Sequence, residues 1–216
     1  MLWLSPMAVI AQQDNVGGWH AYFGNVAIPE SRFSIDAEAQ FRYHEMGSDL
    51  QQLLLRSGVK FAATESLSLT AGYAFVQTEN VGGPDSPVRE NRLYQEANLT
   101  QKTWRFNFRH RFRYEQRFVE DRDFNTRYRY CLFVDIPINR PEMDAKTFYA
   151  SLYNEIFING QKTSDNRAVF DRNRLYLGAG YRFSKNLAVQ AGWMNQVLEN
   201  SAKAQVVLSV HHKSSF

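Results

Sequence analysis

Arginines recur at every second position in one stretch of the chain. Residues 104–117 place Arg105, Arg109, Arg111 and Arg113 at odd positions, while aromatic residues occupy most of the even ones. Successive side chains of a β-strand point to opposite faces, so this spacing puts the guanidinium groups on one face. A guanidinium is a planar fork that binds carboxylates and phosphates through parallel hydrogen bonds. The chemistry these residues could perform is therefore recognition of anions.

The same parity, followed through the other predicted strands, gathers many charged side chains on one face. The cations that we single out there are Arg42, Arg56, Arg105, Arg109, Arg111, Arg113, Arg127, Arg129, Arg172 and Arg174, and the anions are Glu38, Glu115, Asp135 and Glu155. Including Lys60, Arg92, Arg182, Asp36 and Glu96, this face carries thirteen cations and six anions, an excess of seven. The whole chain carries only +3. Positive charge is therefore concentrated on one face.

Catalytic and metal sites are harder to find. His211 and His212 are adjacent, so on a strand they point to opposite faces and do not share a metal. His44, Ser48 and Asp49 fall in one predicted loop and could form a hydrolase triad, but no motif specifies one. We expect no enzyme, no metal and no cofactor, and keep an outer-membrane lipid hydrolase as a remote alternative.

Alternation also defines the elements that position these side chains. Residues 33–43 alternate apolar and polar types without an error. Similar runs predict strands at 53–62, 67–77, 92–102, 104–117, 127–136, 148–157, 172–183, 187–196 and 205–213, with a weaker candidate at 19–28. Short links alternate with long polar loops at 45–51, 78–90, 119–126 and 159–170, which is typical of an up-and-down meander.

The bulk of the apolar face favours a membrane barrel. Ten or more strands with four to six large apolar residues each exceed what the interior of a small soluble barrel can hold. Strands of about 11 residues at about 3.3 Å each, tilted near 45°, span roughly 25 Å, the apolar height of an outer-membrane barrel. Aromatics at 14% with a mean hydropathy of -0.46 fit this pattern. The sequence therefore predicts an all-β fold, a single antiparallel up-and-down transmembrane β-barrel of about 10–12 strands.

The strand count leaves one segment unassigned. Ten strands from residue 33 onward would place both chain ends on the side of the short turns, as expected for the even strand number of bacterial barrels. Residues 19–28 would make eleven. Either this segment does not span, lying in the lumen or at the seam, or a twelfth strand has been missed.

Two interpretations of the arginine-rich interior stay open. In the favoured one, Arg–Glu and Arg–Tyr networks fill a closed or narrow lumen, and the protein is a structural or interaction barrel. In the alternative, the lumen passes or binds small anionic solutes, because rings of arginine select anions. The single cysteine, Cys131, excludes an intramolecular disulfide and is expected to be a small buried residue.

The beginning of the chain suggests export. Residues 1–11 are apolar and end with Val9 and Ala11 at the spacing of a signal-peptidase site, so we predict a signal peptide over 1–11 and a barrel domain over 12–216. The alternative is a buried N-terminal strand. Export implies the bacterial outer membrane, with lipid and lipopolysaccharide as neighbours and a monomeric state favoured. The balanced charge argues against a nucleic-acid partner.

Several segments carry a resemblance to a known family. Residues 154–160 read NEIFING, residues 171–183 read DRNRLYLGAGYRF, and residues 109–114 read RHRFRY. With these motifs the chain, from about Trp19 onward, resembles the bacterial outer-membrane proteins grouped as domain of unknown function 2490. The resemblance implies a single outer-membrane β-barrel and no established activity. Phe216 at the end is typical of such barrels, although Ser214 and His212 replace the apolar residues usual before it.

Overall fold

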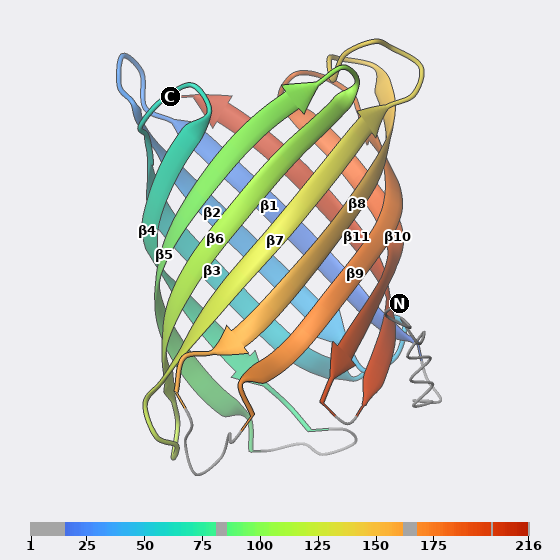
Figure 1. The fold of residues 1–216 in the computed structure, drawn as a ribbon. Helices are drawn as coiled ribbons and strands as arrows, with labels where there is room; N and C mark the ends of the chain where they lie inside the picture. The colour runs from blue at the N-terminus through green and yellow to red at the C-terminus, as the bar shows by residue number, and fades with distance from the viewer. Residues whose placement is uncertain (1–15, 81–85, 162–167, 200, 216) are drawn as a thin grey trace, which may run out of the picture.

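The computed structural model describes residues 16–80, 86–161, 168–199 and 201–215, and there the chain forms one closed barrel of eleven strands (Figure 1). The strands are β1 (Gly17–Ala27), β2 (Phe33–Tyr43), β3 (Leu50–Ala62), β4 (Leu67–Thr78), β5 (Val88–Thr103), β6 (Phe106–Val119), β7 (Asn125–Pro137), β8 (Thr147–Asn159), β9 (Phe170–Arg182), β10 (Leu187–Leu198) and β11 (Ala202–Ser215). The described part of the chain holds no helix of the length and apolarity that crossing a membrane requires. The predicted all-β barrel of 10–12 strands is confirmed.

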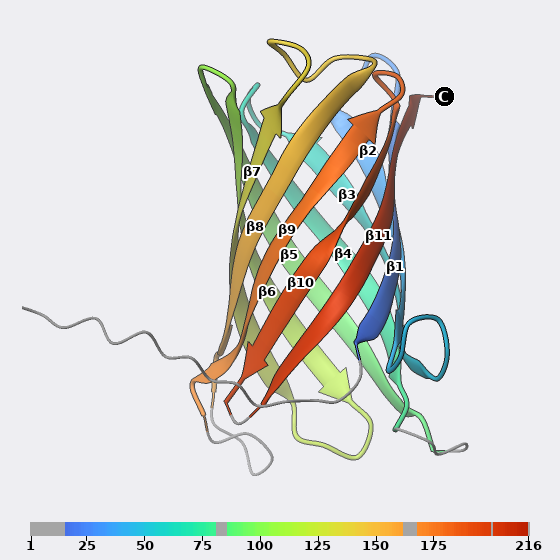
Figure 2. The same cartoon turned by 90° about the vertical axis from the view of Figure 1, so that its right-hand side faces the viewer.

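The barrel closes where its first and last strands meet. Every strand pairs antiparallel with its sequence neighbour, but β1 pairs with β11 in parallel, Gly17 opposite Gln205 through Ala27 opposite Ser215 (Figure 2). An odd number of alternating strands must close this way, because the first and last then run in the same direction. Both expectations for residues 19–28 were therefore wrong. The segment is a full member of the wall, and no twelfth strand is needed to close the barrel.

The two ends of the barrel differ in their connections. At the short-turn end, which we define as the end where β1, β3, β5, β7 and β9 finish, the link between β5 and β6 is only the two residues Trp104 and Arg105. At the opposite, long-loop end, β4 finishes at Thr78 and β5 begins at Val88. Because β1 and β11 are parallel, β1 begins at the long-loop end and β11 finishes at the short-turn end (Figure 1). The expectation that both ends lie on the short-turn side was therefore wrong.

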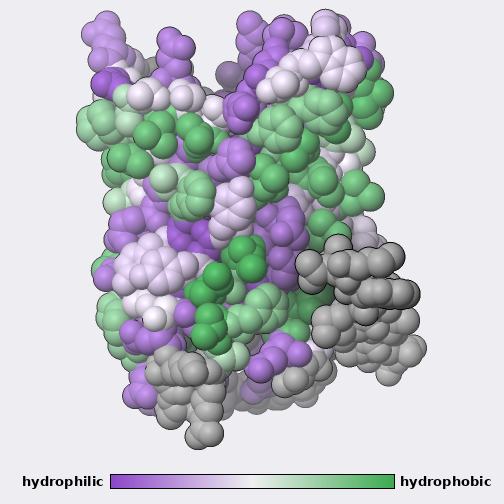
Figure 3. Space-filling model, viewed as in Figure 1, coloured by the Kyte–Doolittle hydropathy of each residue, from purple (hydrophilic) through white to green (hydrophobic). Residues whose placement is uncertain are grey.

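Burial in this barrel is inverted relative to a soluble protein. Large apolar side chains such as Leu177, Phe112 and Val59 are exposed on the outer wall, whereas Glu115, Arg127 and other charged groups are buried inside. Figure 3 shows hydrophobic side chains spread over the outer wall in view, with hydrophilic ones at the upper end and in patches between. The alternation along each strand produces this arrangement directly, since successive residues face opposite sides.

Inward aromatic rings need glycines beside them. The Tyr176 ring lies across Gly178 and Gly192, which are direct partners on β9 and β10. A Cβ on Gly192 would lie 2.6 Å from the Tyr176 ring, 2.6 Å from the Gly178 Cα and 2.6 Å from the Leu177 carbonyl oxygen. Glycine is therefore required for this ring to lie flat against the wall. Tyr176 also belongs to the inward apolar cluster with Trp19, Met194 and Val207.

Candidate functional site: an arginine-rich lumen

The inward side chains leave two cavities along the barrel axis. One, of about 590 Å³, lies toward the long-loop end, and the other, of about 510 Å³, lies toward the short-turn end. Glu38, Arg56 and Arg111 line both, so they mark the region between the cavities. Eleven Arg and Lys side chains and four Asp and Glu side chains line the long-loop cavity, against eight and four in the short-turn cavity. Both cavities are therefore rich in cations.

A chain of ion pairs, here called the waist network, lies at this middle level and consists of Glu38, Arg56, Glu115, Arg129 and Glu155. Arg56 Nη1 lies 2.8 Å from Glu38 Oε2, and Arg129 bridges Glu115 Oε1 and Glu155 Oε1 at 2.6 Å each. Arg56 Nη2 lies 3.9 Å from Glu115 Oε1. Arg56 is on β3 and Glu115 on β6, with β4 and β5 between them in the wall, so this contact joins inward side chains from strands three positions apart.

Further arginines surround the waist network. Arg113 pairs with Glu96 and also lies 3.9 Å from Glu115, while Arg111 Nη2 lies 2.7 Å from Glu155 Oε1. Glu115 is the most enclosed of these carboxylates, with its side chain 1% exposed. Removing one partner of such a buried pair leaves the other charge uncompensated in a medium of low polarity, which is strongly unfavourable. The waist network is thus a rigid, mutually dependent structure.

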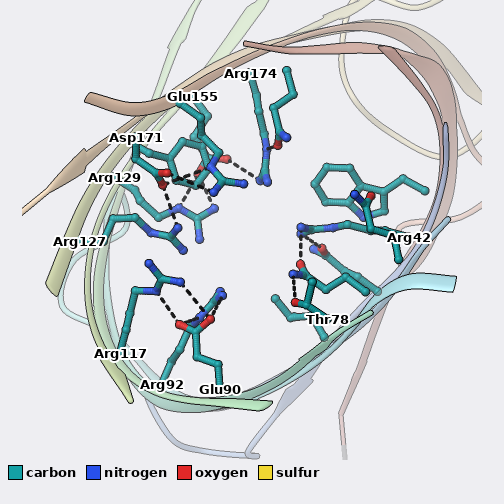
Figure 4. Close-up of a pocket in the computed structure, with 18 of the residues that line it drawn as sticks. Arg42, Thr78, Glu90, Arg92, Arg117, Arg127, Arg129, Glu155, Asp171 and Arg174 are labelled. Atoms are coloured by element: carbon teal, nitrogen blue, oxygen red, sulfur yellow. Dashed lines mark hydrogen bonds and ion pairs between the residues drawn. The ribbon is translucent and has the colours of Figure 1, made fainter. Parts of the chain in front are cut away.

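Carboxylates also pair with the arginines on one wall of the long-loop cavity. Glu90 accepts hydrogen bonds from Arg92 and Arg117, with Nε to Oε1 distances of 2.6 and 2.5 Å, and Arg127 Nη1 lies 3.0 Å from Asp171 Oδ2. Figure 4 shows these side chains extending from the wall toward an open centre. On this wall Glu90 and Asp171 therefore each pair with two arginines, which lowers the excess of positive charge without cancelling it.

The other wall holds its cations with amides. Arg42 donates to Gln52 Oε1 and Gln40 Oε1 at 2.6 Å each, and Arg174 Nε donates to Gln196 Oε1 at 2.8 Å. Lys203 Nζ donates to a further amide oxygen, that of Gln51, at 3.3 Å. Amide oxygens accept hydrogen bonds but carry no charge. Arg42 therefore forms no ion pair with a carboxylate of the described residues, whereas Arg174 Nη1 lies 3.7 Å from Glu155 Oε2, a carboxylate that Arg111 and Arg129 share.

The short-turn cavity has a different character. The Arg109 guanidinium stacks on the Phe133 ring at 3.8 Å, and Asp135 lies in the same cavity. Lys60 Nζ lies 2.7 Å from Asp36 Oδ2. Ser209 Oγ lies 3.0 Å from His211 Nε2 on the same polar surface. The described residues contain no cluster of three or more His, Cys, Asp or Glu side chains that could hold a metal ion.

Most of the predicted lumen residues lie inside the barrel. The structure places Arg42, Arg56, Arg109, Arg111, Arg113, Arg127, Arg129, Arg172, Arg174, Glu38, Asp135 and Glu155 on cavity walls, and Glu115 beneath them in the waist network. Arg105 differs, because it lies in the turn before β6. Its Nη2 donates to the carbonyl oxygens of Pro137, Ile138 and Arg140 at 2.7 to 2.9 Å. It fastens the β7–β8 link and pairs with no lumen carboxylate.

Seven charged residues that line the cavities were missed from the sequence, among them Arg122 and Lys185 in the connections and Lys213 near the end of β11. Glu90, Arg117 and Lys203 lie on the inward face of strands that extend beyond the predicted bounds or share the predicted parity. Following the alternation outward along β5, β6 and β11 would have found them. Asp171 breaks the alternation, because a bulge between Phe157 and Ile158 shifts the register and brings Asp171 inward beside Arg172.

The residues considered for other chemistry have other partners. His44 Nε2 lies 3.3 Å from the Glu79 carbonyl oxygen, and Ser48 Oγ donates to Glu45 Oε2 at 3.0 Å. The side-chain hydrogen bonds of His44 and Ser48 thus go to Glu79 and Glu45. Cys131 is fully buried on the inward side of β7. The signal peptide predicted over residues 1–11 lies outside the described residues.

Comparisons with known proteins agree with the resemblance seen in the motifs. The family model described as "Protein of unknown function (DUF2490)" matches residues 16–207. An uncharacterised protein of Methylorubrum extorquens (strain AM1) is 32% identical over 171 residues, which cover 77% of this chain and 72% of the relative. No solved structure matches significantly.

Proposed function

The chain belongs to the DUF2490 family of proteins of unknown function, and on that premise we propose that it is an outer-membrane β-barrel closed at its waist. It serves as a structural or interaction barrel of the bacterial envelope and has no catalytic role. Residues 1–11 act as its export signal. Its outer wall meets lipid and lipopolysaccharide, and it works as a monomer.

Inverted burial supports the membrane location. Leu177 is 65% exposed and Phe112 53%, whereas Glu115 is 1% and Arg127 3% exposed. In water this arrangement would expose apolar surface on every side and would bury charge inside, which no soluble fold tolerates on this scale. In a bilayer the apolar wall faces hydrocarbon and the closed ladder leaves no strand edge unpaired. Strands of 11 to 16 residues are long enough to cross it.

The Arg56–Glu115 contact is the observation that carries the proposal of closure. A barrel that conducts solutes freely keeps its charged groups along the wall, where water screens them. Here a guanidinium from β3 reaches within 3.9 Å of a carboxylate from β6, and Arg129 continues the chain of charges to β8. The two cavities are thus vestibules on either side of a closed middle.

Two measurements test this proposal. Fractionation of cells that express the chain should recover it with the outer membrane, and recovery in the soluble fraction would refute the membrane location. Purified protein reconstituted in planar bilayers should show no discrete conductance. A steady conductance that favours anions would instead support the second candidate, a passive channel for small anionic solutes. The excess of cations in both cavities is the observation that favours this candidate.

A further inference from the structure

We propose that the long-loop cavity binds a small organic polyanion, a molecule with two or more carboxylate or phosphate groups, through Arg42 and Arg174. This inference rests on the proposed function in one respect: the closed waist makes the cavity a binding site instead of a passage.

Arg42 and Arg174 lie around a common aromatic ring. The Arg42 guanidinium carbon lies 3.9 Å from the centre of the Trp19 ring, and that of Arg174 lies 4.9 Å from it. Trp19 on β1 is the direct strand partner of Arg42 on β2, while Arg174 comes from β9. The parallel β1–β11 closure places these strands within reach of one another. Stacking on an indole holds a guanidinium in place while leaving its in-plane N–H donors available.

Amide oxygens accept the hydrogen bonds of both arginines, and only Arg174 also has a carboxylate within ion-pair distance. Arg42 Nη1 and Nη2 donate hydrogen bonds to Gln52 and Gln40, and Arg42 Nε has no hydrogen-bond partner among the described residues. Arg174 Nε donates a hydrogen bond to Gln196, and Arg174 Nη1 lies 3.7 Å from Glu155 Oε2, its nearest carboxylate oxygen. No Asp or Glu among the described residues forms an ion pair with Arg42.

The surrounding charge strengthens the case for an anion. The carboxylates of the opposite wall, Glu90 and Asp171, each pair with two other arginines, so they do not pair with Arg42 or Arg174 (Figure 4). Lys203, held by another amide, adds a third cation to the same wall. A concave site with one sign of excess charge and walls of low polarity concentrates ions of the opposite sign. An entering anion would neutralise charges that the protein itself leaves unpaired.

The size and position of the cavity define the ligand class. A volume of about 590 Å³ admits a small organic molecule and excludes a polymer. Two guanidinium groups on different strands favour a ligand with at least two anionic groups over a monovalent ion. Phe157 and Tyr153 in the lining provide apolar contact for its carbon skeleton.

Isosteric substitutions test the site with little risk to folding. Gln52→Glu and Gln196→Glu keep the hydrogen bonds to Arg42 and Arg174 but neutralise both cations. The matched control is Gln190→Glu, which alters an amide of the short-turn cavity that donates to Ser151. The variant Arg42→Gln removes one guanidinium outright, and Arg109→Gln is its control in the other cavity.

Trp19 provides the signal. In a background where the other three tryptophans are replaced by phenylalanine, the full chain is refolded in detergent and titrated with inorganic pyrophosphate, with citrate and with glycerol. We expect saturable changes in Trp19 fluorescence with pyrophosphate, citrate or both, and none with glycerol; the responding ion identifies phosphate or carboxylate chemistry. Loss of one charge-assisted contact should weaken binding about 10-fold or more in Gln52→Glu, Gln196→Glu and Arg42→Gln. The two controls should bind as the parent does.

Three results would overturn the inference: no saturable binding by the folded parent, equal affinity in parent and Gln52→Glu/Gln196→Glu protein, or loss of binding in Arg109→Gln alone. Conductance is recorded on the same preparation, so that failure of the anion site can be distinguished from failure of the proposed closed barrel. Binding together with conductance would retain the site and refute the closed waist. Absence of both would refute the site and leave the closed barrel standing.

Discussion

Replacing Glu115 with alanine should destabilise the barrel more than any change at an exposed carboxylate. Its side chain is 1% exposed and lies 2.6 Å from both Arg127 and Arg129, and 3.9 Å from Arg56 and Arg113. Removal would leave four buried guanidinium groups around an empty site. Breaking a buried pair in this way costs about 3–5 kcal/mol. Glu115→Gln retains a hydrogen-bond acceptor, so its effect should fall at the lower end of that range.

Reversible urea unfolding of the refolded protein in lipid or detergent measures this difference. The matched control is Glu142→Ala, whose carboxylate lies 2.8 Å from Lys102 but is 69% exposed. Exposed pairs contribute about 0–1 kcal/mol, so the control should remain close to the parent. A double-mutant cycle of Glu115→Gln with Arg129→Gln should show a coupling energy of about 1–3 kcal/mol. If Glu115→Ala and Glu142→Ala lowered the free energy of unfolding equally, the view of the waist network as a buried, interdependent structure would fail.

Three other outcomes follow from the wall and its ends. Gly192→Ala should lower the free energy of unfolding by about 1–3 kcal/mol, because its Cβ would lie 2.6 Å from backbone atoms and the Tyr176 ring. Urea titration beside Gly24→Ala, whose Cβ would approach only the half-exposed Tyr22 side chain at 3.0 Å, checks this. Arg105→Gln should speed proteolysis within residues 138–146 without changing anion binding, since Arg105 holds the carbonyl oxygens of that link; an unchanged cleavage rate would count against this role. Outer-membrane barrels keep their long loops outside the cell, so a cysteine at Met46, in the loop after β2, should react with a membrane-impermeant maleimide on intact cells. One at Glu65, in the turn after β3, should not, and the reverse pattern would contradict this orientation.

Local alternation explains why so much of the wall could be predicted from the sequence. Residues 33–43 match the observed β2 at both ends, because each side chain there has an unambiguous preference for lumen or outer wall. Arg105 shows where alternation does not predict the structure. The two-residue turn at Trp104 and Arg105 does not interrupt the alternation, so the pattern extends two residues too far. Trp104 has a φ of 52°, a turn conformation that no periodicity reveals.

Features that depend on closure could not be predicted. The parallel pairing of β1 with β11 joins residues nearly two hundred positions apart, and only the complete strand count requires it. The Arg56–Glu115 contact depends in the same way on how strands are staggered around the barrel. Sequence parity placed the arginines other than Arg105 on the inward face, but it could not distinguish those bound by carboxylates from Arg42, whose hydrogen bonds go to amides. That distinction is the basis of the inferred anion site.

Single-channel recording of the reconstituted parent beside an Arg56→Ala/Glu115→Ala variant tests the central claim most directly. These two side chains make the contact between β3 and β6. The closed-waist account predicts a silent parent and an anion-selective conductance in the variant, because the remaining arginines would then line a continuous path. A parent that conducts as readily as the variant would contradict it.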